Sequence, residues 1–124
     1  MNLNQVTISS KDLEISVVFY KLLGLQLIVD ALPRYARFTC PDGEATFSIH
    51  QKINMQSSDN TTVYFEDDNL KDLVFKLKQK GITFTSDIED KSWLWTEAHL
   101  EDPDGNKIIL FNAGINRKNP PWRI

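Results

Sequence analysis

A repeat with a constant offset constrains this chain more than any other feature of its sequence. Leu13 and Gly24 recur as Leu70 and Gly81, in each case 57 positions later. At 124 residues the chain can bury one sizeable core but not two independent ones. We therefore expect a single domain built from two similar halves, about 1–53 and 60–113, followed by a C-terminal tail, 114–124.

Each half contains one predicted amphipathic helix. Apolar residues recur at i, i+3, i+4 and i+7 within residues 12–23 and again within residues 70–80. A glycine follows each segment, as is common just beyond the end of a helix. The stripes predicted to face the core are Ile15, Val18, Phe19 and Leu22 in the first helix and Leu70, Leu73, Val74 and Leu77 in the second.

Four short strands are predicted around each helix. They span 5–9, 25–29, 35–40 and 45–50 in the first half, and 62–66, 82–85, 93–101 and 107–111 in the second. Pro41-Asp42-Gly43 and Pro103-Asp104-Gly105 favour hairpin turns, because proline presets the first corner and Asp-Gly tolerates the step that reverses the chain. Each half is therefore expected to be βαβββ, and the fold class is α+β.

Composition and charge exclude several kinds of partner. The net charge of −3 argues against binding of nucleic acid, which needs clustered Lys and Arg. No apolar run approaches the length of a membrane span, and residues 1–5 have no features of a signal peptide, so we expect no membrane partner and a cytoplasmic location. Cys40 is the only cysteine, so the chain has no Cys-x-x-Cys motif that would indicate a zinc site.

Several motifs, taken in order, resemble the glyoxalase, bleomycin-resistance and extradiol-dioxygenase superfamily, also called vicinal oxygen chelate. They are the segment 9–14 after the first strand, Phe19-Tyr20 followed by Leu23-Gly24-Leu25, and Asp102-Pro103-Asp104-Gly105-Asn106 before the last strand. The resemblance covers nearly the whole chain. It implies that the eight strands curl into a mixed-sheet cup that binds a small organic molecule, and that two copies form a homodimer.

Enzymes of that family hold a divalent metal with His or Glu from four strands. The resemblance maps these four positions onto Gln5, Ser48, Thr62 and Ile109. An amide, two hydroxyls and a hydrocarbon are weak or absent ligands for transition metals. We therefore expect no metal and no other cofactor. A set made of His50, His99, Glu66 and Glu97 is a disfavoured alternative, because it lacks the positions at the cup floor.

Strand alternation divides the side chains into two sets independently of the resemblance. Val6, Ile8, Phe47, Ile49, Val63, Phe65, Ile108 and Leu110 are expected to pack under the helices. The opposite set combines hydroxyl, amide, imidazole and aromatic groups, as expected of a small-molecule site. For the third strand of each half, 35–40 and 93–101, alternation does not decide which face points inward. The predicted ligand-binding residues are Gln5, Thr7, Arg37, Ser48, His50, Thr62, Tyr64, Trp93, Trp95, Ile109 and Phe111.

Three functions remain in competition. The first is a metal-free binding protein similar to the bleomycin-resistance branch, which sequesters a small, aromatic-bearing molecule. The second is a glyoxalase-like lyase, isomerase or dioxygenase with an atypical metal site or none, in which His50 or Glu97 would act as acid or base. The third is an interaction module whose cup is vestigial. For Arg37, a surface pair with Asp30 or Glu44 is favoured over pairing with an anionic ligand.

Overall fold

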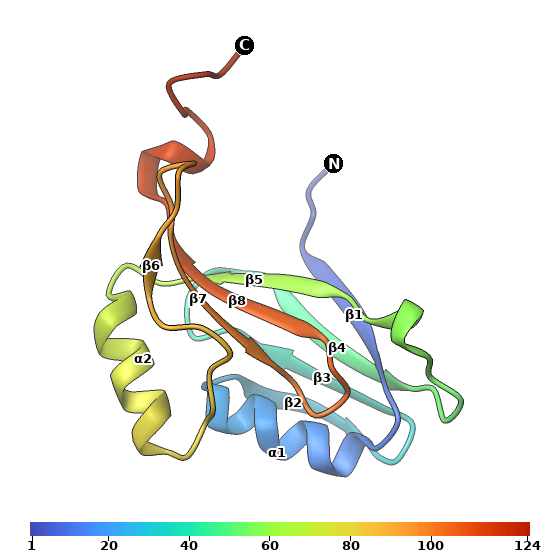
Figure 1. Ribbon diagram of the computed structural model, residues 1–124. Coiled ribbons are helices and arrows are strands. Elements are labelled where there is room, and N and C mark those ends of the chain that lie inside the picture. Colours follow the sequence, from blue (N-terminus) through green and yellow to red (C-terminus); the bar gives the residue numbers. More distant parts are fainter. The chain divides into compact units, whose positions relative to one another are not determined.

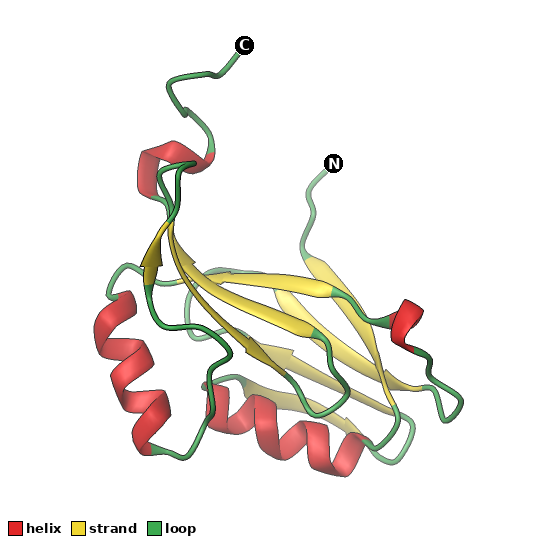
Figure 2. Cartoon of the chain, in the orientation of Figure 1, coloured by secondary structure: helices red, strands yellow, loops and turns green.

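The computed structural model describes all residues, 1–124, as two compact units with the same topology (Figure 1). Unit 1 comprises residues 1–61 and 102–106, and unit 2 comprises residues 62–101 and 107–124. Each unit contains one α-helix and one four-stranded mixed sheet. Figure 2 colours the helices red and the strands yellow. The predicted α+β class and the two βαβββ modules are confirmed. None of the helices has the length and apolar character that a membrane span requires.

Unit 1 places its first and last strands side by side. Its elements are β1 (Gln5–Ser10), α1 (Leu13–Leu23), β2 (Gln26–Ala31), β3 (Tyr35–Thr39), β4 (Thr46–Gln51) and the short 3-10 helix η1 (Ser57–Asp59). The strand order is β1-β4-β3-β2, in which β1 and β4 are parallel and the other pairs are antiparallel. The helix connects β1 to the far edge of the sheet, which leaves β1 free to pair with β4.

Unit 2 repeats this order. Its elements are β5 (Thr62–Glu66), α2 (Leu70–Gln79), β6 (Glu89–Asp90), β7 (Thr96–Glu101), β8 (Lys107–Asn112) and the 3-10 helix η2 (Gly114–Arg117). The strand order is β5-β8-β7-β6, again with one parallel pair, β5 and β8. The offset of 57 holds for the starts of both helices, Leu13 and Leu70, and of the first strands, Gln5 and Thr62.

The contacts of Tyr20 show which face of the first sheet α1 covers. Its ring centroid lies 5.9 Å from that of Phe38 and 4.7 Å from that of Phe47, and the side chains of Tyr20 and Phe38 are fully buried. Phe38 and Phe47 therefore belong to the helix side. Because side chains alternate along a strand, the intervening residues of β3 and β4 lie on the face that the helix does not cover. We call this second surface of each sheet its helix-free face.

The stripe predicted for α1 was wrong. Ile15 and Val18 are 56% and 59% exposed, and the buried residues of the helix are Leu13, Ser16, Val17, Tyr20 and Leu23. Both sets satisfy the same i, i+3, i+4, i+7 spacing, so periodicity alone could not separate them. In α2 the prediction was correct for Leu70, Val74 and Leu77, which are buried, and Leu73 is half-buried.

Two strand predictions in unit 2 also need correction. Residues 82–85 form no strand, and the place next to β7 is taken by the two-residue β6. Only isolated bonds link this segment to β7, such as the one from the Thr85 amide to the His99 carbonyl (2.8 Å). The strand predicted at 93–101 begins at Thr96, because the chain turns before it and Leu94 adopts a left-handed φ of 67°. Val6, expected under a helix, is 36% exposed on the edge strand β1.

The turn between β7 and β8 belongs to unit 1 although both strands belong to unit 2. Asp102 is buried and accepts hydrogen bonds from the Tyr20 hydroxyl (2.6 Å) and the Asn106 side-chain amide (2.8 Å). Asn106, also fully buried, in turn donates to the Ser9 carbonyl and accepts from the Thr61 amide. One buried polar network therefore joins α1, the end of β1 and the start of the second half of the chain.

The variant Tyr20→Phe tests this network. It leaves the buried Asp102 carboxylate without one donor, which should lower the free energy of unfolding by about 1–3 kcal/mol in urea titrations near neutral pH. The control Tyr64→Phe removes a hydroxyl that makes no hydrogen bond on a half-exposed ring, and its midpoint should stay close to that of the wild type.

The same variant has an alkaline signature. Burial and, next, the neighbouring Asp102 carboxylate raise the pKa of Tyr20 well above its ordinary value. The native state therefore keeps a proton that the unfolded chain loses above about pH 10, so this contribution to stability is present below that pH and declines above it by about 1.4 kcal/mol per pH unit. Tyr20→Phe should remove that part of the decline. An unchanged alkaline slope would contradict the proposed role of the network.

Candidate functional site

Three side-chain hydrogen bonds link β1 to β4 along the helix-free face of unit 1. The Thr46 hydroxyl donates to Gln5 Oε1 (2.8 Å), Thr7 and Ser48 share a bond of 2.6 Å, and Ser9 Oγ lies 2.9 Å from His50 Nε2. Each bond joins a pair of residues in register on the parallel strands. The alternation argument thus correctly placed Gln5, Thr7, Ser48 and His50 on one face. We call these three bonds the β1–β4 ladder.

Tyr35 and Arg37 extend the same face onto β3. They stand opposite His50 and Ser48 in the register, and Arg37 Nε donates to the Tyr35 hydroxyl (2.9 Å). Hydrogen bonding by Ser48 and, to a smaller degree, by Arg37 lowers the pKa of Tyr35. The pairing of Arg37 with Asp30 or Glu44 that we favoured from the sequence was wrong, because Arg37 makes no ion pair in this structure.

The helix-free face of unit 2 is aromatic. Its buried cluster consists of Ile109, Phe111 and Ala113 with Trp95 packed against them, and it includes no residue of α2. Trp95 and Phe111 stack with their ring centroids 4.7 Å apart, and Tyr64 meets both rings edge-on. Phe111 and Ile109 are about 5% exposed, although alternation places them opposite the Ile108 and Leu110 side of β8. Strand β8 is therefore apolar on both faces. Thr62 lies exposed at the start of β5, beside Lys107.

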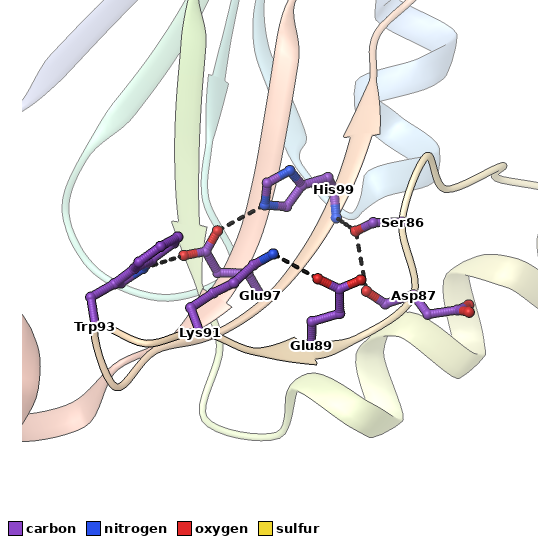
Figure 3. A network of polar contacts seen from close by, with 7 residues as sticks. All are labelled: Ser86, Asp87, Glu89, Lys91, Trp93, Glu97 and His99. Atoms are coloured by element: carbon purple, nitrogen blue, oxygen red, sulfur yellow. Dashed lines mark hydrogen bonds and ion pairs between the residues drawn. The ribbon is translucent and has the colours of Figure 1, made fainter.

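A buried carboxylate adjoins these rings (Figure 3). Glu97 stands opposite Phe111 in the register, and its side chain is only 3% exposed. One of its oxygens accepts a hydrogen bond from the Trp93 indole nitrogen (2.6 Å), and the other lies 2.7 Å from His99 Nε2. From the sequence, the inward face of the strand predicted at 93–101 stayed open. The register now shows that Glu97 and His99 share the face of Ile109 and Phe111.

The loop before β7 makes further polar contacts near Trp93 and His99 (Figure 3). Lys91 binds Glu89 at 2.7 Å and lies 6.0 Å from the centre of the Trp93 ring. Ser86 accepts a hydrogen bond from the His99 amide. Trp93 was expected on a strand in phase with Glu97. It instead reaches Glu97 from the turn, so the contact arises from the loop and not from alternation.

The four residues that the resemblance maps onto the family's metal positions do not offer a donor set for a transition metal. Gln5 and Ser48 are engaged in the β1–β4 ladder, Thr62 offers one hydroxyl, and the Ile109 side chain has no donor atom. Neither unit gathers three or more His, Cys, Asp or Glu side chains that could hold a metal ion. Of the alternative set, Glu66 accepts from the Ala113 amide and pairs with Arg117, while Glu97 and His99 bind each other.

Sequence reasoning left Glu97, His99 and Tyr35 out of the predicted binding residues. A carboxylate, an imidazole and a phenol were visible at alternate positions, but nothing in the sequence assigned their face. The register with β4 and β8 supplies that assignment, since β3 and β7 each pair with a strand whose faces are known. A Glu flanked by Trp93 and His99 could have been noticed as a carboxylate with two potential donors.

Comparison with known proteins agrees with this architecture. The family model described as Glyoxalase/Bleomycin resistance protein/Dioxygenase superfamily matches residues 2–110. A search of curated protein sequences gives no match. Because the family match extends over most of the chain, it reaches both βαβββ modules.

Solved structures with this fold include a resistance determinant, a binding protein and an enzyme. A bleomycin resistance determinant encoded on transposon Tn5 superposes with a TM-score of 0.77 at 20% identity, covering 92% of this chain and 99% of its own. A bleomycin-binding protein complexed with bleomycin gives 0.75 at 20% identity, covering 90% and 98%. Lactoylglutathione lyase from Agrobacterium tumefaciens gives 0.78 at 12% identity, covering 95% and 96%. The family match and the shared fold together place this chain in the glyoxalase/bleomycin resistance protein/dioxygenase superfamily.

Proposed function

We propose that this chain is a metal-free small-molecule-binding protein that resembles the bleomycin resistance proteins. The observation that carries the proposal is the aromatic helix-free face of unit 2, where Trp95, Phe111 and Tyr64 contact one another beside a buried carboxylate. Aromatic surface with a few placed polar groups is typical of sites for small organic molecules. The solved bleomycin complex with this fold supports the choice of ligand class.

The residues that the sequence predicts to bind a ligand are found in both units. Those in unit 2 are mainly apolar and aromatic, and those in unit 1 are mainly polar groups of the β1–β4 ladder together with Arg37. We keep the set predicted from the sequence: Gln5, Thr7, Arg37, Ser48, His50, Thr62, Tyr64, Trp93, Trp95, Ile109 and Phe111. That the chain is a single domain and that it is located in the cytoplasm are part of the same proposal. An unpaired Cys40 is compatible with a reducing compartment.

An enzyme is the second candidate, and the pairing of His99 with Glu97 favours it. An imidazole held by a carboxylate is a common form of general base. This function would be a glyoxalase-like lyase, isomerase or dioxygenase reaction that does not use the family's usual metal ligands. The third possibility, an interaction module, has no comparable observation in its favour.

Metal-free bleomycin and a panel of planar aromatic compounds test the binding function. A ligand bound only by the native state raises the melting temperature. Trp95→Ala should weaken the best binder at least about tenfold in titration calorimetry, which is ~1.4 kcal/mol. Trp122→Ala, which alters an exposed tryptophan of the tail, is the matched control and should bind as the wild type does. If no compound raises the melting temperature at millimolar concentration, the binding function is rejected.

Elemental analysis tests the metal-free part of the proposal. Protein purified without chelator from metal-supplemented medium should contain zinc, nickel, manganese and iron only far below one ion per chain, because the matched positions lack imidazole and carboxylate donors. Stoichiometric amounts of any of these metals would favour the enzyme instead.

Two copies are proposed to associate through the exposed stripe of α1, formed by Ile15, Val18 and Leu22 with the half-buried Phe19. Isolated apolar residues are common on surfaces, but a contiguous stripe is typical of an interface. In an antiparallel pair of α1 helices related by a twofold axis near Val18, Glu14 of each copy would lie beside Lys21 of the other. These opposite charges favour a second copy as the occupant of this surface.

Val18→Glu should therefore produce monomers of about the chain mass, 14.3 kDa, in sedimentation at micromolar concentration. Phe75→Glu is the matched control, because Phe75 occupies the equivalent position of α2 and is 61% exposed. Lys21→Glu should also weaken the dimer, and combining it with Glu14→Lys should restore it. A wild-type protein that is strictly monomeric would rule out the dimer.

A further inference from the structure

The side chain of His99 has one ring nitrogen with a partner and one without. Nε2 lies 2.7 Å from Glu97 Oε1, whereas no protein atom makes a hydrogen bond with Nδ1. Figure 3 shows Nδ1 on the side of the ring that points away from Glu97. The His99 side chain is 34% exposed, in contrast to the 3% of Glu97. This nitrogen is therefore an unused polar atom on a partly exposed side chain.

The other contacts of Glu97 determine what Nδ1 can do. The Trp93 indole nitrogen can only donate, so Glu97 Oε2 is an acceptor. A carboxylate oxygen can only accept a hydrogen bond, so in its contact with Glu97 Oε1 the His99 Nε2 atom is the donor and carries the proton. A neutral imidazole with its proton on Nε2 has its lone pair on Nδ1. Glu97 thus fixes the tautomer that makes Nδ1 an acceptor.

The position of His99 in the sheet places this acceptor beside the aromatic groups. Across the sheet, Ile109 stands between Tyr64 on β5 and His99 on β7. Neighbouring strands are about 4.8 Å apart. An aromatic ring lying over Ile109 would therefore have Tyr64 at one edge and the His99 imidazole at the other.

We propose that His99 Nδ1 is the hydrogen-bond acceptor that selects, on the helix-free face of unit 2, an aromatic ligand carrying an O–H or N–H donor. Glu97 is the positioning residue, since it acts on the ligand only through the tautomer of His99. This inference rests on the proposed binding function and narrows its ligand class. It also explains why a carboxylate is buried next to Phe111, where an apolar side chain would avoid the cost of removing a charge from water.

Nitrogen NMR of the imidazole side chains tests the tautomer without any ligand. In alkaline buffer, where imidazole is neutral, wild-type His99 should show a protonated Nε2 and an unprotonated Nδ1. His99→Phe identifies the signals, because only His50 then remains. In Glu97→Gln the amide can accept from Trp93 and donate to Nε2, which should move the proton to Nδ1. A wild-type His99 protonated at Nδ1 would overturn the proposal.

Phenol and toluene test the selection itself, because they have nearly the same shape and differ in one hydroxyl. Binding is followed through the Trp95 indole N–H signal. Phenol should bind wild type about three- to tenfold more tightly than toluene, the range expected for one hydrogen bond. The ratio should fall to about one in His99→Phe and Glu97→Gln. Glu66→Gln, which changes another carboxylate of the same face, should keep the wild-type ratio.

The two probes separate the inference from the function on which it rests. If both bind wild type with equal affinity, the selection by His99 is rejected while the aromatic binding face stands. If neither perturbs Trp95, both the binding face and the selection are rejected. A phenol preference that survives in both His99→Phe and Glu97→Gln would assign the donor contact to another group and overturn the role of His99.

Discussion

The hydrogen bonds of Asp102 are the constraint on which the first unit depends. A buried carboxylate is tolerated only when donors surround it, and here the Tyr20 hydroxyl, the Asn106 side chain and the Asp104 and Asn106 amides supply them. Gly105 completes this turn at a φ of 85°, and an added Cβ would lie 3.0 Å from Asn60 Nδ2. The Asp-Pro-Asp-Gly-Asn segment is therefore a structural anchor for α1 as well as a hairpin turn.

The two modules share a topology but differ in the chemistry of their helix-free faces. In unit 1 the strands β1 and β4 are joined by hydroxyl, amide and imidazole groups, and Ser48 is fully buried among them. In unit 2 the equivalent strands β5 and β8 carry Tyr64, Ile109 and Phe111. A duplicated backbone thus provides one polar and one aromatic surface.

The sequence predicted topology better than it predicted burial. Alternation is a local property of a strand, so it placed Thr7 with Ser48 and Tyr64 with Phe111 correctly. Burial of α1 depends on which of two equally spaced stripes meets the sheet. The 57-residue offset distinguishes the two stripes. It relates the buried residues of α2, which are Leu70, Val74 and Leu77, to Leu13, Val17 and Tyr20, which are buried in α1. Tyr20 was not predicted to face the core, and the partner that satisfies its buried hydroxyl, Asp102, lies 82 positions away in the sequence.

Only part of the candidate site could be predicted from the sequence, for a related reason. Strand residues could be assigned to a face, whereas the contact of Trp93 with Glu97 arises from a turn with a left-handed residue, Leu94, which no periodicity describes. The proposed loss of metal donors also has a structural counterpart. A metal would link strands by ligands contributed from each, and in this chain β1 and β4 are linked instead by hydrogen bonds between neighbouring side chains. Such a face connects its two strands through side-chain hydrogen bonds without an ion.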